Sequence, residues 1–218
     1  MLYHLFYICY VGITRYIFAQ AILKGIDMAN IKEKVGGRYG LNRYVVLVIL
    51  LSFLGWCFET LYVYMQFGHW GDSGFMSLPF CPIYGCTLTA VYFLAGTPHQ
   101  PRGIMQEAPS KTLRYVLYFV VAFLLPTVME YIVGAFFYQH FHIRLWSYTT
   151  MPYNVNGYVC LPVSLAWAGL IFVFMRYAFL PLKNWVGKTS DKIAWGLVVI
   201  LGIVFIVDTA YNVYKILA

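Results

Sequence analysis

The sequence predicts an all-α, polytopic membrane protein, and its composition and the length of its apolar runs support that prediction. Of the 218 residues, 61% are hydrophobic and only 11% are charged, whereas about a quarter of residues are charged in soluble domains. The mean hydropathy is +0.70. The apolar residues form runs of about 20, the length that crosses a hydrocarbon core about 30 Å thick as a helix. We therefore predict one transmembrane helix-bundle domain over residues 44–218, with five core helices.

The region before this domain, residues 1–43, holds a hydrophobic segment over residues 2–23 and then a basic stretch. Because the segment contains His4 and Arg15, we interpret it either as a sixth transmembrane helix or as an interfacial helix. A second interpretation is that translation begins at Met28, which would make the segment an upstream extension.

The first core helix, residues 44–65, carries one acid in its interior, Glu59. A carboxylate at membrane depth costs about 2.5–3.5 kcal/mol on insertion scales, so it normally faces protein or a water-filled cavity. At helical spacing, Ser52, Gly55 and Glu59 share one face. We predict that this small and polar face packs against other helices of the chain.

The other core helices also carry polar or helix-breaking residues. The second run begins with Pro79 and Pro82, so its first turns are predicted to be irregular. The third helix contains Pro126 and Glu130, and the fifth contains Asp208. The five predicted helices cover residues 44–65, 79–95, 113–137, 157–179 and 193–215.

The distribution of basic residues predicts the orientation. Twelve of the fifteen Lys and Arg residues fall in three alternate connections, residues 24–43, 102–114 and 176–192. By the positive-inside rule these connections are cytoplasmic, which fits a multi-pass protein of the plasma membrane. The net charge of +7 is therefore a topology signal, and we expect no nucleic-acid partner.

With this orientation, three acids share one depth. Glu59, Glu130 and Asp208 lie 15 to 17 residues from the inner ends of their helices, or roughly 22–26 Å into a core about 30 Å thick. We therefore predict a polar pocket in the outer half of the membrane. Its candidate binding residues are Trp56, Glu59, Tyr84, Glu130, Tyr131, Asn154, Asn156, Cys160 and Asp208.

The sharpest expectation is that Glu59 and Glu130 face each other across this pocket. Two acids at close range cannot both ionise cheaply, so one carries a proton or the pair binds a cation or a donor side chain. The alternative is that both are neutral, hydrogen-bonded acids that only fix helix packing. For Asp208 the alternative is a helix end that frays into the outer headgroups.

The sequence carries no nucleotide-binding motif. The Gly-Lys-Thr at residues 187–189 has Leu182 where a P-loop needs its first glycine. His140 and His142 have no carboxylate or thiol beside them, so we predict neither a metal nor a cofactor. The aromatic residues of the outer loops, Trp146 and Tyr148 among them, are predicted to be interface anchors.

Several short motifs resemble those of a known family. They are Phe53-Leu54-Gly55-Trp56 with Glu59, Gly74-Phe75, Pro82-Ile83-Tyr84-Gly85, Glu130-Tyr131 with Gly134, and Trp146 and Tyr148 with Asn154, Asn156, Gly157, Cys160 and Leu161. In this order, over about residues 51–181, the chain resembles the bacterial ABC-transporter type IV family of permease-like integral membrane proteins. It departs from the family pattern at Ser73, Ser147 and Tyr158, where we expect charged residues.

The resemblance implies a permease-like subunit of a transport system, with a separate ATPase docking on the basic cytoplasmic loops. An alternative is a membrane-embedded enzyme that acts on a lipid or lipid-linked substrate at the outer leaflet, using a carboxyl group as acid or base. A third is a membrane assembly or scaffold protein. The absence of a known catalytic motif favours a non-enzyme, and the residues leave the substrate and the oligomeric state open.

Overall fold

The computed structural model describes residues 39–68 and 75–217. The predicted N-terminal segment, the start at Met28 and Ser73 lie outside the described residues. The predicted domain boundary between residues 43 and 44 stays a prediction.

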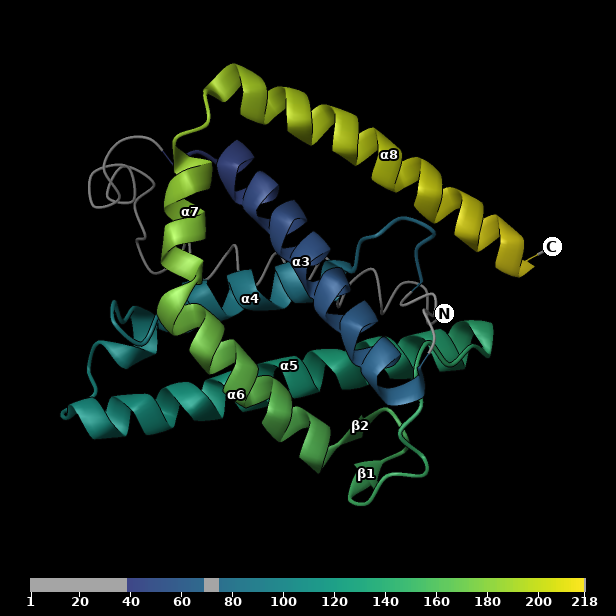
Figure 1. Ribbon diagram of the computed structural model, residues 1–218, viewed down its shortest axis with the longest axis horizontal. Helices are drawn as coiled ribbons and strands as arrows, with labels where there is room; N and C mark the ends of the chain where they lie inside the picture. The colour runs from purple at the N-terminus through teal and green to yellow at the C-terminus, as the bar shows by residue number, and fades with distance from the viewer. Residues whose placement is uncertain (1–38, 69–74, 218) are drawn as a thin grey trace. The chain divides into compact units, whose positions relative to one another are not determined.

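Over the described residues the chain is all-α, with six α-helices (Figure 1). The helices are α3 (Leu41–Phe67), α4 (Pro82–Ala95), α5 (Lys111–Phe141), α6 (Leu161–Tyr177), α7 (Phe179–Gly187) and α8 (Asp191–Leu217). A 3₁₀ turn, η1 (Gly103–Met105), precedes α5, and a short antiparallel hairpin of β1 (Asn154–Val155) and β2 (Val159–Cys160) precedes α6.

Three of these helices, α3, α5 and α8, are long and apolar enough to cross a membrane, so the five spans predicted from the sequence are not confirmed. The pair α6 and α7 passes the same test only together, and the chain bends by 50° between them. Helix α4 has 14 residues, or about 21 Å, which is short of a core about 30 Å thick. The structure thus supports three spans, or four if the bent pair counts as one.

Prolines explain why α4 begins later than the predicted second helix and why the predicted fourth helix is divided into α6 and α7. Pro82 is the first residue of α4, because a proline there loses no helical hydrogen bond. Residues 79–81 are irregular as predicted, but the helix is regular from Pro82 onward, so the prediction of irregular first turns holds only before Pro82. Pro181 lies in the first turn of α7, where its ring would clash with the carbonyl of Tyr177 in a continuous helix. Accordingly α6 ends at Tyr177 and the chain turns.

Helices α3 and α4 approach each other closely at small residues. A β-carbon on Gly85 would overlap the Ser52 side chain and the carbonyl of Val48 on α3. The Cys81 amide donates to the Ser52 carbonyl at 3.2 Å. This confirms that the face of α3 that contains Ser52 packs against another helix of the chain.

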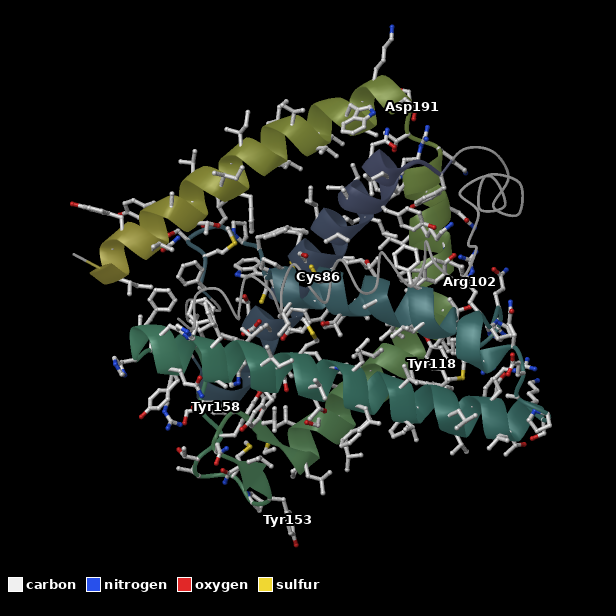
Figure 2. All side chains as sticks on the ribbon, turned by 180° about the vertical axis from the view of Figure 1, so that it is seen from behind. Cys86, Arg102, Tyr118, Tyr153, Tyr158 and Asp191 are labelled. Atoms are coloured by element: carbon white, nitrogen blue, oxygen red, sulfur yellow. The ribbon has the colours of Figure 1, made fainter. Side chains whose placement is uncertain are left out.

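Helices α5 and α6 pack against each other and cross at an angle, as Figure 1 shows. Tyr118 of α5, labelled in Figure 2, is fully buried. Its hydroxyl donates to the Gly96 carbonyl at 3.1 Å. Its ring meets Phe172 of α6 edge to face, with 5.9 Å between the ring centroids. Ala122 and Ala168 are also fully buried, as expected where helices approach closely in lipid.

The beginning of α3 is tied to the connection between α7 and α8. Arg43 forms an ion pair with Asp191 at 2.7 Å and donates two hydrogen bonds to the Thr189 carbonyl, at 2.9 and 3.0 Å. Asn42 also donates to Asp191. These contacts fix the two helix starts at one level.

Candidate functional site

Glu59 is held where α3 crosses the start of α4. It follows Gly55 by one helical turn, and a β-carbon on Gly55 would overlap Tyr84, so this glycine lets the Tyr84 side chain lie against α3. The Glu59 carboxyl takes part in hydrogen bonds with the side chains of Cys81 and Tyr84. The Tyr84 ring in turn packs against Trp167 of α6, with 5.4 Å between centroids. Glu59 therefore contacts the start of α4, and Tyr84 connects this contact to α6.

Glu130 of α5 is close enough to Glu59 for the two charges to interact. The same electrostatic neighbourhood includes Tyr84 and Tyr148. Tyr148 lies in the loop between α5 and the hairpin, and burial raises the pKa of its phenol, with the nearby Glu130 charge adding to the effect. Tyr148 therefore stays protonated at neutral pH and offers these acids an O–H donor. We call Glu59, Cys81, Tyr84, Glu130 and Tyr148 the polar cluster.

The hairpin before α6 directly follows the loop segment that carries Tyr148 of the polar cluster. Asn154 organises it: its side chain donates to the Met151 carbonyl at 2.8 Å and accepts from the Gly157 amide at 3.1 Å. Asn156 has a positive φ of 55°, which asparagine tolerates, and its side chain donates to the Tyr131 hydroxyl at 3.0 Å. Asn154 and Asn156 thus shape and anchor the loop.

Trp146 and Tyr158 connect this loop to α5. The Trp146 indole donates to the Tyr158 carbonyl at 2.8 Å, and the Tyr158 ring lies edge to face on Tyr131, with 5.5 Å between centroids. A β-carbon on Gly134 would come within 3.2 Å of Tyr158, so the absence of a side chain at this glycine lets the Tyr158 ring pack against α5. The inference from sequence that Trp146 and Tyr148 are interface anchors missed these contacts, because residue type alone does not show that the loop folds back on α5.

Three further predicted site residues, Cys160, Trp56 and Asp208, make their contacts outside the polar cluster or at its edge. The Cys160 thiol donates to the Met151 sulfur at 3.6 Å and interacts electrostatically with Tyr148. Trp56 stacks on Phe53 of its own helix. Asp208 accepts hydrogen bonds from the Ser77 amide at 3.1 Å and from Asn212 at 3.2 Å. In these contacts Asp208 fastens α8 to the loop before α4.

The polar cluster is rich in acids and poor in cations. Within residues 39–68 and 75–217, neither Glu59 nor Glu130 forms a salt bridge. Arg144 of the same loop instead stacks on Tyr138, with its guanidinium carbon 4.6 Å from the ring centroid. In that described part of the chain no three His, Cys, Asp or Glu side chains are grouped as a metal site. The polar pocket itself stays a prediction.

Comparison with known proteins identifies the family. The family model described as "Putative ABC-transporter type IV" matches residues 46–213. No curated protein and no solved structure matches the chain. The family match confirms the resemblance seen in the motifs and, with the apolar helices, is consistent with a component of membrane transport. Because the match covers well over half of its length, this chain belongs to the ABC-transporter type IV family.

Proposed function

We propose that the protein is the permease-like subunit of a transport system in the plasma membrane, with its substrate or ion path passing the polar cluster. The observation that supports this proposal is the electrostatic interaction of Glu59 from α3 with Glu130 from α5, in a neighbourhood that also includes Tyr84 and Tyr148. Ionisable groups inside membrane segments are expensive and normally mark pathways for substrates, ions or protons. The family membership points to transport independently.

The chemistry of the polar cluster favours a substrate that is a cation or that carries a proton. Two carboxylates that repel each other electrostatically are stabilised by a shared proton or by a bound cation. The tyrosine hydroxyls can donate to a carboxylate, and their oxygens can accept from a ligand. When the bound cation leaves, a proton can replace it. The polar cluster then has a cation-bound state and a protonated state of similar charge.

The direction of the chain in the membrane follows from its basic residues. The basic connections at residues 102–114 and 176–192 are placed on the cytoplasmic side, and the loop at residues 142–156 on the outer side. This placement requires the short helix α4, with the residues before it, to bring the chain back across the membrane. The polar cluster then lies in the outer half of the membrane. A separate ATPase docks on the basic connections, because this chain has no nucleotide-binding motif of its own.

Copurification followed by reconstitution tests this function. The tagged chain, extracted from its source cell in gentle detergent, is expected to bring down an ATPase, and the reconstituted complex is expected to move solute on addition of ATP. A complex of Glu59→Gln should still contain the ATPase but move no solute. Glu107→Gln, at an exposed acid outside the candidate binding residues, serves as the matched acid-to-amide control and should keep transport. If no ATPase copurifies and vesicles of the purified sample move no solute, the permease role is wrong.

One observation favours a second function, a membrane-embedded enzyme for lipid or lipid-linked substrates. The Glu59 carboxyl hydrogen-bonds with both a thiol and a phenol, the pairing of an acid or base with a second group that such chemistry needs. Cellular lipid profiles with and without the gene distinguish the two functions. An accumulating lipid precursor in the deletion strain supports the enzyme, and an unchanged profile supports the permease.

A further inference from the structure

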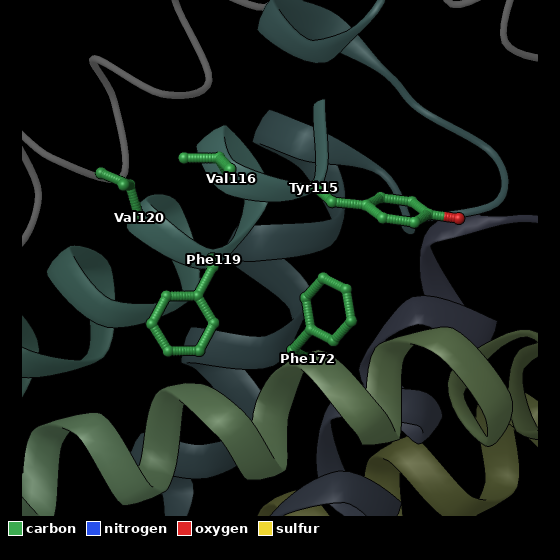
Figure 3. Close-up of a pocket in the computed structure, with 5 residues that line it drawn as sticks. All are labelled: Tyr115, Val116, Phe119, Val120 and Phe172. Atoms are coloured by element: carbon green, nitrogen blue, oxygen red, sulfur yellow. The ribbon is translucent and has the colours of Figure 1, made fainter. Parts of the chain in front are cut away.

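Helices α5 and α6 line an open apolar groove that the polar cluster does not use. It has a volume of about 310 Å³ and is lined by Tyr115, Val116, Phe119, Val120 and Phe172 (Figure 3). Val116 is 55% exposed and Val120 is 43% exposed, so the groove opens away from the helix pair. We call it the aromatic groove.

One end of the aromatic groove is positively charged. The Arg176 guanidinium carbon lies 5.4 Å from the centroid of the Tyr115 ring, and the Lys111 ammonium lies 5.8 Å from it. Lys111 is the first residue of α5 and Arg176 is in the last turn of α6, so the antiparallel pair brings both cations to the same level. Two cations on one ring mark a place of positive potential beside an apolar surface.

The two arginines near this end each have one donor without an acceptor. The Arg176 guanidinium takes part in hydrogen bonds with the side chains of Tyr115 and Tyr177, but its Nε atom and that of Arg114 are buried and have no hydrogen-bond partner among the described residues. In the same part of the chain, neither Lys111 nor Arg176 forms a salt bridge. Buried donors are normally satisfied, and an anion with several oxygens suits guanidinium groups best.

The depth of these groups matches the profile of a phospholipid. Tyr115 lies about 6 Å along α5 from Lys111, and Val120 lies about 14 Å along it. The cations therefore sit at headgroup level and the aromatic groove reaches into the acyl region. A ligand that fits both parts has an anionic head and an apolar tail, and basic pockets between transmembrane helices are suited to such headgroups.

We propose that the aromatic groove binds one anionic phospholipid, with its phosphate between Lys111 and Arg176 and an acyl chain along Phe119 and Phe172. The site does not depend on the proposed transport function. It also gives the exposed apolar side chains of this part of α5 a defined occupant.

Native mass spectrometry of the detergent-purified full chain tests the proposal, with phosphatidylglycerol and phosphatidylcholine as the added lipids. The wild-type chain is expected to bind phosphatidylglycerol about 30-fold more tightly, since each basic side chain at a membrane surface contributes about fivefold. The double variant Lys111→Gln with Arg176→Gln should bind the two lipids equally. The control pair Lys188→Gln with Lys192→Gln, on exposed basic residues elsewhere, should keep the preference.

Three outcomes would overturn the proposal: equal binding of the two lipids by the wild-type chain, a preference that survives in the Lys111 and Arg176 double variant, or an equal loss in the control pair. If the double variant does not fold, Val116→Trp decides, because it fills the groove from an exposed position. Loss of the tightly bound lipid in that variant supports the proposal. Unchanged lipid binding contradicts it, and dissociation of an oligomer alone assigns the aromatic groove to a second copy of the chain.

Discussion

Single residues fix the surroundings of the two acids. Glu59 depends on Gly55, since only a residue without a β-carbon leaves room for the Tyr84 side chain that meets the carboxyl. Glu130 interacts with Tyr148, whose loop is held by the Asn156 hydrogen bond to Tyr131 of α5 and by the Trp146 hydrogen bond to the Tyr158 carbonyl. The polar cluster therefore depends on close packing and loop hydrogen bonds around two carboxyl groups that are costly to place in a membrane.

Replacing either acid by its amide should separate function from folding. Glu59→Gln and Glu130→Gln keep the hydrogen-bonding shape of a neutral acid but can neither bind a cation strongly nor exchange a proton. We expect each variant to fold and to lose transport. Glu59→Leu leaves Cys81 and Tyr84 without their partner and should cost about 1–3 kcal/mol of stability as well. Transport and thermal unfolding of the purified variants are the measurements, and full activity in the double glutamine variant would refute the role.

Gly55 offers a test of packing that leaves charge unchanged. Gly55→Ala should lower the free energy of unfolding by about 1–3 kcal/mol, because the new methyl group overlaps Tyr84. Gly169→Ala on α6 is the matched control, since a β-carbon there meets nothing within 4 Å and alanine favours helix. Unfolding in mixed micelles measures both. Equal effects of the two substitutions would show that α3 and α4 do not approach closely at Gly55.

At the scale of the helices, the sequence predicts positions better than boundaries. The periodicity of Ser52 and Gly55 indicates which face of α3 is packed, because burial repeats with the helix. Hydropathy cannot separate α6 from α7, since the residues on both sides of the bend are apolar. Nor does it predict the hairpin at Asn154 or the return of Tyr158 to α5, which depend on a left-handed turn and on tertiary hydrogen bonds.

The bend between α6 and α7 should depend on Pro181. Pro181→Ala restores a backbone donor and removes the clash with Tyr177, so the two helices are expected to become more nearly continuous. Spin labels at the exposed positions Leu165 and Trp185 should then move apart as the 50° bend opens. An unchanged distance distribution would place the cause of the bend in packing rather than in the proline. Pro162→Ala, at the start of α6, is the control.

For the whole molecule, the arrangement of basic residues predicts a fixed orientation. In a background without other reactive cysteines, Thr149→Cys should react with a membrane-impermeant thiol reagent added to intact cells. Lys188→Cys should react only after the cells are permeabilised, because its connection is placed in the cytoplasm. Both positions are exposed, so accessibility does not bias the comparison. The reverse pattern would put the polar cluster in the inner half of the membrane.

The proposal as a whole depends on α3 and α5 bringing their acids together, and crosslinking tests this most directly. All five native cysteines are replaced, cysteines are placed at Glu59 and Glu130, and the purified chain is treated with a short thiol-to-thiol reagent. We expect an intramolecular crosslink between positions 59 and 130, seen by mass spectrometry, and none between 59 and 208, because Asp208 instead bonds to Ser77 and Asn212. A crosslink only in the second pair would show that the acids of α3 and α5 do not share a site.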